Sequence, residues 1–400
     1  MTPAERTPTA PLSDRGFAFF ALHLWTVFGL ALSNVFFGLA ALASLARLRR
    51  RRIDWSRHRA VLLPLGLYTT CVLVSMLMSH DARASLGGAH ELLSLATIPM
   101  ALLLVRGERR AHLVVDGLLV VAALCAVYGL IQLLFFGYGG IDNRVPGPFS
   151  HYMTFAGILL MADLLLIGSL LCGGHRSLWR WAALLLINLA LLSTLTRSAW
   201  VAFAVALTLC LLLRRPRWVL AYLPAALLFA VLAPSPVVQR VISIFDLQDV
   251  SNYDRICMVE AGLSMVAERP LVGLGPGMVR RAYPLYRHPS APRRWVPHLH
   301  NNLVHIAAEE GLPTLAAYLW LTAGSLLLGY RGYRRSMHAD EATTGLYLGG
   351  LLALAGFNLA GLFEYNWGDT EVQRVALFLI AMPWCMEAAD EPAAFEPERG

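Results

Sequence analysis

The chain alternates long apolar blocks with short segments rich in arginine, and this alternation restricts the fold more than any other feature. Each block is about 17–25 residues long, the length that an α-helix needs to cross a bilayer. Only 15% of the 400 residues are charged, against about 25% in soluble proteins. All 33 basic residues are Arg, and they gather between the blocks as topology signals do. The pattern excludes a soluble protein and predicts an all-α, polytopic membrane protein without a nucleic-acid partner.

The densest basic run, residues 47–59, orients the chain. The positive-inside rule makes this run cytoplasmic. Counting outward from it predicts about 12 transmembrane helices, with both termini in the cytoplasm and Arg in every inside loop. The first apolar stretch predicts a helical hairpin that turns near Asn34. The predicted segments are 17–46 (the hairpin), 60–79, 92–105, 112–136, 153–172, 181–195, 199–213, 218–233, 313–329, 346–362 and 374–385.

Five regions follow from this topology: a cytoplasmic tail (1–16), nine spans (17–233), one large periplasmic loop (234–312), three spans (313–388) and a second cytoplasmic tail (389–400). No cleavage site of small residues follows the first apolar block, so we expect an uncleaved tail and not a signal peptide. The six Cys are scattered without a CxxC pair, which suggests neither a zinc site nor a disulfide framework.

The large loop is predicted to be mostly helical. An apolar-periodic run at 254–267 predicts a helix that ends before Pro270, and 278–286 predicts a second helix. The Gly-rich segment 273–277 lies between them. Such a segment either offers backbone N–H groups to an anion or is a purely structural turn.

A basic cluster follows in the same loop, close to Tyr283 and Tyr286; its members are Arg280, Arg281, Arg287, Arg293 and Arg294. A solvated face is one interpretation. A funnel for phosphate-bearing lipid or sugar is the other, because the planar guanidinium fork donates two hydrogen bonds to phosphate.

Two histidines, His298 and His300, lie at the end of this loop. A neutral His accepts a proton from a sugar hydroxyl near pH 7. In a helix that began at His298, the two rings would point to different sides. We therefore expect the helix to start after Asn301, a good N-cap residue, so that both rings share one site. Metal chelation is the alternative, with Glu309, Glu310 or His305 as third ligand.

Isolated charges also occur at the predicted outer membrane edge, where they are costly enough to suggest function. Arg144 and Arg197 are the clearest cases. Glu364 and Asp369 join the last two spans, and simple solvation explains them equally well.

Four segments together resemble the O-antigen ligase and polymerase superfamily, over about residues 140–375. They are Arg144 with Gly147-Pro148-Phe149 and His151; Leu195-Thr196-Arg197-Ser198, in a slightly rearranged order; Arg255 with 270–277 and Tyr283; and His300-Asn301 with Glu309, Gly311 and Thr314. The layout of 12 spans with one large late periplasmic loop is also similar, and implies the GT-C-like architecture of lipid-carrier glycosyltransferases.

The resemblance implies an O-antigen ligase of the bacterial inner membrane, active in lipopolysaccharide biosynthesis. Such an enzyme transfers a glycan from undecaprenyl diphosphate to a sugar hydroxyl of lipid A–core, with inversion and without metal or other cofactor. The implied catalytic residues are His300 as base, His298 as helper or alternative, and Glu309 to orient a His. The implied diphosphate-binding residues are Arg197, Arg255 and Arg144. Further substrate contacts are expected from Asn301, Arg280, Arg281, Tyr283, Arg287 and Glu364.

Three alternatives stay open at this point. An O-antigen polymerase performs the same chemistry on a growing glycan, and a protein O-oligosaccharyltransferase uses a Ser or Thr hydroxyl. A transporter of the lipid-linked glycan would place charge deep among the helices and would not need His300.

Overall fold

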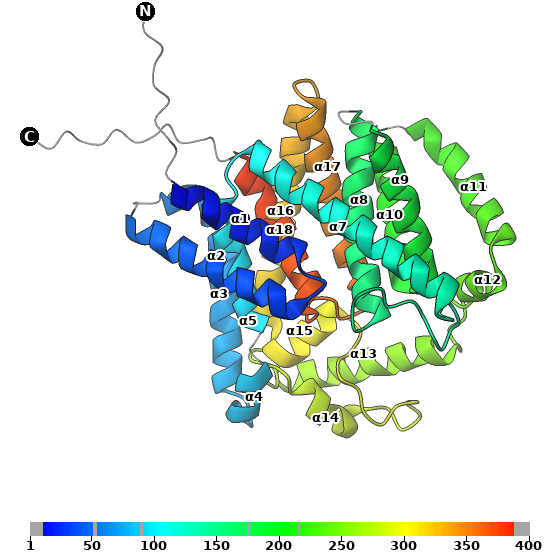
Figure 1. Ribbon diagram of the computed structural model, residues 1–400. Helices are drawn as coiled ribbons and strands as arrows, with labels where there is room; N and C mark the ends of the chain where they lie inside the picture. The colour runs from blue at the N-terminus through cyan, green and yellow to red at the C-terminus, as the bar shows by residue number, and fades with distance from the viewer. Residues whose placement is uncertain (1–10, 51–53, 89–90, 174–176, 215, 388–400) are drawn as a thin grey trace, which may run out of the picture.

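The computed structural model describes residues 11–50, 54–88, 91–173, 177–214 and 216–387 (Figure 1), and this part of the chain is helical and has no strand. The α-helices are α1 Pro11–Trp25, α2 Leu30–Arg50, α3 Arg59–Leu77, α4 Ala82–Gly88, α5 Glu91–Ser94, α6 Thr97–Leu104, α7 Glu108–Phe135, α8 Tyr152–Cys172, α9 Leu178–Ser193, α10 Arg197–Arg214, α11 Val219–Leu232, α12 Ser235–Ile242, α13 Val250–Glu268, α14 Val279–Tyr286, α15 Asn302–Glu310, α16 Leu312–Ser336, α17 Glu341–Ala360 and α18 Thr370–Glu387.

Helical structure is present at every predicted span. Eight segments of the described chain are long and apolar enough to cross a membrane: Leu30–Arg50, Trp55–Leu77, Ala82–Leu104, Glu108–Phe135, Tyr152–Cys172, Arg197–Arg214, Leu312–Ser336 and Glu341–Ala360. The helix α9 is apolar but shorter. These lengths and hydropathies support a multi-pass membrane protein. The count of 12, the side of the membrane and the five-region division stay predictions.

The centre of the bundle is formed by α8 and α17, the most buried of the candidate spans. They pack side by side (Figure 1), with Gly168 of α8 against Gly349 of α17. A Cβ on Gly168 would collide with the backbone of Gly349. Small residues at this contact therefore let the two backbones approach closely, which drives helix association where lipid supplies no hydrophobic force.

Three polar residues inside predicted spans make hydrogen bonds between helices. His23, Asp116 and Asp163 would be costly in an apolar bundle without partners. Their partners are Ser33 at 3.1 Å, Arg180 at 2.6 Å and Asn188 at 3.0 Å, respectively. These contacts account for all three residues without ion transport.

The first hairpin turns earlier than predicted. The chain leaves helical structure between α1 and α2 at residues 26–29, where Gly29 donates its N–H to the carbonyl of Thr26. The predicted turn residue, Asn34, lies inside α2 and accepts a hydrogen bond from Arg374 at 2.6 Å. The polar side chain therefore serves a contact between helices and not the turn.

Three other boundaries differ from prediction. The predicted span 92–105 is broken into α5 and α6, because Pro99 in the first turn of α6 cannot follow helical residues without clashing with the carbonyl four residues earlier. The helix α13 starts before residue 254, since Asp249 caps it by accepting from the Asn252 N–H. The helix α1 starts inside the predicted tail 1–16; residues 1–10 and 388–400 of the predicted tails lie outside the described residues.

The helices of the large loop, α12 to α15, gather at one end of the bundle (Figure 1), where α13 runs across the helix ends. They enclose a small apolar core of their own, with Met258, Tyr283 and Leu299 fully buried. This second core holds the loop rigidly against the bundle and fixes the segments that line the site.

Candidate active site

A cavity of about 750 Å³ lies between the loop helices and the ends of the bundle. Its walls come from five places that are distant in sequence: the end of α4 with the start of α5, the segment before α8 with the start of α8, the helices α12 and α13, the segment before α15 with α15 itself, and the segment before α18. Its volume is within the range of small-molecule sites. The side chains that define its chemistry are His298, His300, Glu364, Arg144, Arg240 and Arg255.

Both histidines share this cavity, because α15 starts after them. Asn301 has extended backbone angles and accepts a hydrogen bond from the Val304 N–H at 3.0 Å, which confirms the predicted N-cap. The centroids of the His298 and His300 rings are 4.3 Å apart. His300 has a φ of 49°, one of two positive φ values of non-glycine residues in the described chain. Such strain of about 1–3 kcal/mol is typical of functional sites, and here it turns the ring toward the cavity.

A carboxylate from the last inter-helix segment faces both rings. Oε1 of Glu364 lies 2.8 Å from Nδ1 of His300 and 3.9 Å from Nδ1 of His298. The short contact to His300 lacks the alignment of a full hydrogen bond and is a close contact between Nδ1 and the carboxylate. Burial by itself would raise the pKa of Glu364, but the charges of His300, His298 and Arg255 lower it to about 2. Burial lowers the pKa of His298 to about 3. The site therefore keeps an ionised carboxylate beside a neutral His298.

Glu309, which the sequence suggests as the orienting acid, has another partner. Its carboxylate accepts the N–H groups of Gly277 at 2.7 Å and Val279 at 2.8 Å, and lies 3.5 Å from Nε2 of His305. The Gly-rich segment thus presents the N–H of Gly277 to the protein's own carboxylate, and its N–H groups at 273–275 donate to backbone carbonyls. The orienting position next to His300 is filled by Glu364.

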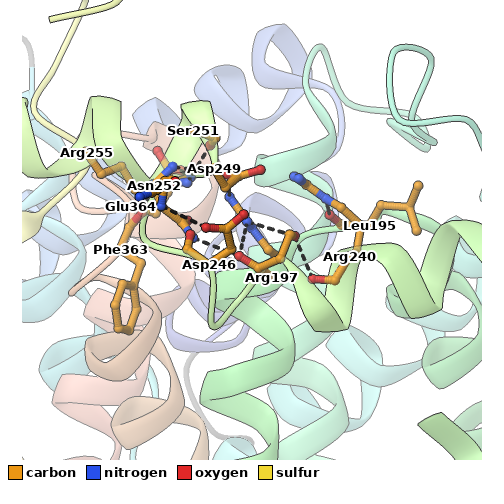
Figure 2. Close-up of polar contacts among 12 residues, drawn as sticks. Leu195, Arg197, Arg240, Asp246, Asp249, Ser251, Asn252, Arg255, Phe363 and Glu364 are labelled. Atoms are coloured by element: carbon orange, nitrogen blue, oxygen red, sulfur yellow. Dashed lines mark hydrogen bonds and ion pairs between the residues drawn. The ribbon is translucent and has the colours of Figure 1, made fainter. Parts of the chain in front are cut away.

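The three predicted diphosphate-binding arginines differ in their surroundings, and Figure 2 shows two of them, Arg197 and Arg255. Arg197 is 7% exposed and does not line the cavity; it donates to the Ser243 carbonyl at 2.8 Å and pairs with Asp249 at 3.0 Å. Arg255 lines the cavity, with its Nη2 3.9 Å from Glu364.

Arg144 also lines the cavity. It donates to the Ile141 carbonyl at 2.9 Å and stacks over the ring of Tyr152, with 4.5 Å between the guanidinium carbon and the ring centroid. Of the three predicted cations, two therefore reach the cavity directly and one lies behind its wall.

The structure places five expected substrate contacts away from the cavity lining. Asn301 is occupied by its cap and by a bond to the Leu362 carbonyl at 2.9 Å. The other four are Arg280, stacked on Trp295; Arg281, paired with Asp81; Tyr283, buried in the loop core; and Arg287, bonded to the Ala291 carbonyl. The sixth, Glu364, lines the cavity.

Sequence reasoning missed several lining residues, of which Arg240 and Glu91 have ionisable side chains. Arg240 lies in an amphipathic helix without any motif, and Glu91 lies in a segment that looks like an ordinary span. No local signal distinguishes either residue. Arg293 and Asp369 also line the cavity, and Thr154 donates a hydrogen bond to Asp369.

A metal ion has one candidate position in the described part of the chain. One ligand atom from each of His298, His300 and Glu364 lies within 4.8 Å of the others. Two imidazoles and one carboxylate are a known ligand set for Zn²⁺. The third ligand in this cluster is Glu364 and none of the three that the sequence suggests.

Fold and site together define a multi-pass membrane protein with a cavity at one end of its bundle, lined by histidine, carboxylate and arginine. Comparison with protein families matches residues 181–319 to the family described as O-antigen ligase. This match supports membership of the O-antigen ligase family, as the sequence motifs predict. The matched segment includes Arg197, Arg255 and His300. No curated protein matches the chain. The family implies a membrane glycosyltransferase-like activity on a lipid-linked glycan.

Proposed function

We propose that the protein transfers O-antigen polysaccharide from undecaprenyl diphosphate to a sugar hydroxyl of lipid A–core, in a cavity open to the periplasm. The observation that carries this proposal is the pairing of His300 with Glu364 at 2.8 Å in a cavity that is also lined by arginines. A hydroxyl acceptor needs a base, and a diphosphate leaving group needs cations. The cavity holds both kinds of group.

His300 is the proposed base. Its Nδ1 lies 2.8 Å from the Glu364 carboxylate, which favours the tautomer protonated at Nδ1 and leaves a lone pair on Nε2 for the acceptor hydroxyl proton. As the acceptor oxygen attacks the anomeric carbon, the proton moves to Nε2, and the bond between that carbon and the phosphate oxygen breaks on the opposite face. The negative Glu364 stabilises the imidazolium that forms. His298, 4.3 Å from His300 between ring centroids, is the helper or the alternative base.

The leaving diphosphate is the proposed ligand of the arginines. Negative charge develops on the phosphate oxygen that was bonded to the anomeric carbon as that bond breaks. A guanidinium fork stabilises this charge with two hydrogen bonds. Arg255 and Arg144 line the cavity and are placed to do so. These cations supply without a metal what Mg²⁺ supplies in many phosphate-transfer sites. Polymerisation of the glycan would use the same groups with another acceptor.

The test is a transfer assay with purified protein, an undecaprenyl-diphosphate-linked glycan and lipid A–core. We expect glycosylated lipid A–core from the wild type and none from His300→Ala. The matched control is His288→Ala, an exposed histidine of the same loop outside the cavity lining. Longer glycans on the carrier without ligated product would change the assignment to a polymerase. The absence of both products would favour a transporter.

An assay with a chelator decides whether His298, His300 and Glu364 act in proton transfer or as ligands of a metal ion. We expect full activity in excess EDTA if His298, His300 and Glu364 act as a proton relay. Loss of activity that a divalent cation restores would instead assign the three side chains to a metal ion.

A further inference from the structure

The positive charge of the cavity is not evenly compensated. Four arginines line it. Arg255 lies 3.9 Å from Glu364, and Arg293 lies 3.0 Å from Asp254. The other two, Arg144 and Arg240, make no ion pair with a carboxylate of the described chain; they donate hydrogen bonds to the backbone carbonyls of Ile141 and Leu195. The excess positive charge of the cavity therefore comes from Arg144 and Arg240.

Arg240 is the more unusual of the two. It is 8% exposed, and its hydrogen bond is a long one of 3.3 Å from Nε to the Leu195 carbonyl. Burial lowers the pKa of Arg240 to about 10. The nearby charges of Arg144 and Arg197 act in the same direction, and Asp249, which is paired with Arg197, acts in the opposite direction. A buried cation without an ion pair of its own is costly unless an anion joins it. Because Arg240 lines the cavity, an anion bound there can supply that charge.

Arg197 has protein partners of its own and holds Arg240 in place. Its Nη1 donates to the carbonyl and the hydroxyl of Ser243. Its Nη2 pairs with Asp249 (Figure 2). Ser243 follows the last residue of α12, the helix that carries Arg240, and its hydroxyl donates to the Arg240 carbonyl at 2.9 Å. Arg197 therefore ties the start of α10 to the end of α12.

We propose that Arg240, together with Arg144, binds the phosphate groups of the lipid-linked donor, and that Arg197 acts on the donor only by positioning Arg240. This inference rests on the proposed function. A diphosphate carries at least two negative charges and enough oxygen atoms for both guanidinium forks. The donor thus supplies the missing counter-charge of the cavity. Release of the diphosphate product restores the uncompensated state, which favours exchange for a new donor.

The experiment measures binding of inorganic pyrophosphate and of undecaprenyl diphosphate to the full-length protein in detergent by calorimetry. Arg240→Gln is compared with Arg294→Gln, an exposed arginine of the large loop outside the cavity lining. We expect the Kd of Arg240→Gln to rise by about 10- to 100-fold, as for the loss of a charge-assisted hydrogen bond. We expect no change in Arg294→Gln. Arg240→Lys keeps the charge but not the fork and should give an intermediate Kd.

Thermal unfolding separates binding from structure. Arg240→Gln removes an uncompensated buried charge, so its melting temperature should stay the same or rise. Arg197→Gln breaks the tie to Ser243 and Asp249, so both its melting temperature and its affinity should fall. A wild-type Kd with a lowered melting temperature in Arg240→Gln would overturn the proposal, because Arg240 would then only hold Leu195. If Arg240→Gln does not fold, a wild-type Kd in Arg240→Lys has the same meaning.

Two further outcomes distinguish the ligand and the function. Tighter binding of undecaprenyl diphosphate than of pyrophosphate, with the same dependence on Arg240, supports a lipid-linked donor. Failure of undecaprenyl diphosphate to displace pyrophosphate overturns the proposal that these arginines bind a lipid-linked donor. Binding that depends on Arg240 in a protein without glycan transfer refutes the proposed function alone. Normal transfer and wild-type Kd in Arg240→Gln refute this inference alone.

Discussion

Replacing Glu364 by Gln removes one negative charge from the site and preserves the shape of the side chain. Two unit charges separated by the 2.8 Å between Glu364 and His300 interact by about 6 kcal/mol at an effective dielectric constant of about 20, and by about 1.5 kcal/mol in bulk water. These limits correspond to losses of about 10⁴-fold and about 10-fold in rate. Because the contact lines a cavity and is not fully aligned, we expect a loss of about 100-fold.

The loss should appear in kcat and not in KM, because His300 becomes positive only as it takes the acceptor proton. The assay is glycan transfer to lipid A–core at saturating donor and acceptor, with wild type, Glu364→Gln and Glu260→Gln. Glu260 is an exposed carboxylate of α13 that does not line the cavity, and its variant should behave as wild type. A kcat of Glu364→Gln within about threefold of wild type would refute the assignment of Glu364 as the partner of the base.

Three further predictions concern stability. Asn301→Ala should lower the free energy of unfolding by about 1 kcal/mol, because the side chain caps α15; chemical denaturation measures it. Gly311→Ala should strongly lower the melting temperature, since Gly311 has a φ of 88° and a Cβ there would meet backbone atoms, whereas Gly140→Ala, with nothing within 4 Å, should change it little or raise it. The melting temperature should also fall in acid. His298 has a folded pKa of about 3 and takes up its proton mainly on unfolding, so stability declines as the pH drops below 6.5. Glu364 has a folded pKa of about 2 and adds to the decline below pH 4.5. A melting temperature that stays constant between about pH 7 and about pH 4 would contradict this expectation. The Glu364→Gln variant is measured beside the wild type as the control.

Much of the helical structure follows from the sequence, because it depends on residues close together in the chain. Hydropathy over about 20 residues predicts where helices lie, and a helix was found at each predicted span. Asn301 predicts the start of α15, since a cap acts on N–H groups two or three residues away. The same local rule brings His298 and His300 to one side of the helix start.

Boundaries failed where a contact between helices competes with a local signal. Asn34 is a common turn residue, yet it lies in α2 because Arg374 of α18 uses its side chain. The Gly-rich segment offers N–H groups to an anion, and the sequence does not say which one. In the structure the N–H of Gly277 donates to Glu309, 32 residues later, and the N–H groups at 273–275 donate to backbone carbonyls, so all of these donors have protein partners.

The sequence by itself determined the helical, membrane-spanning class of this chain, its large late loop and the family motifs around Arg197, Arg255 and His300. Only the tertiary structure decided which charges meet. Glu364 faces His300 across 64 residues of sequence, and Arg240 reaches the cavity from a helix without a motif. The physical reason is that spacing along a helix encodes contacts within a few turns, whereas packing of distant segments sets which charges share a cavity and which are neutralised.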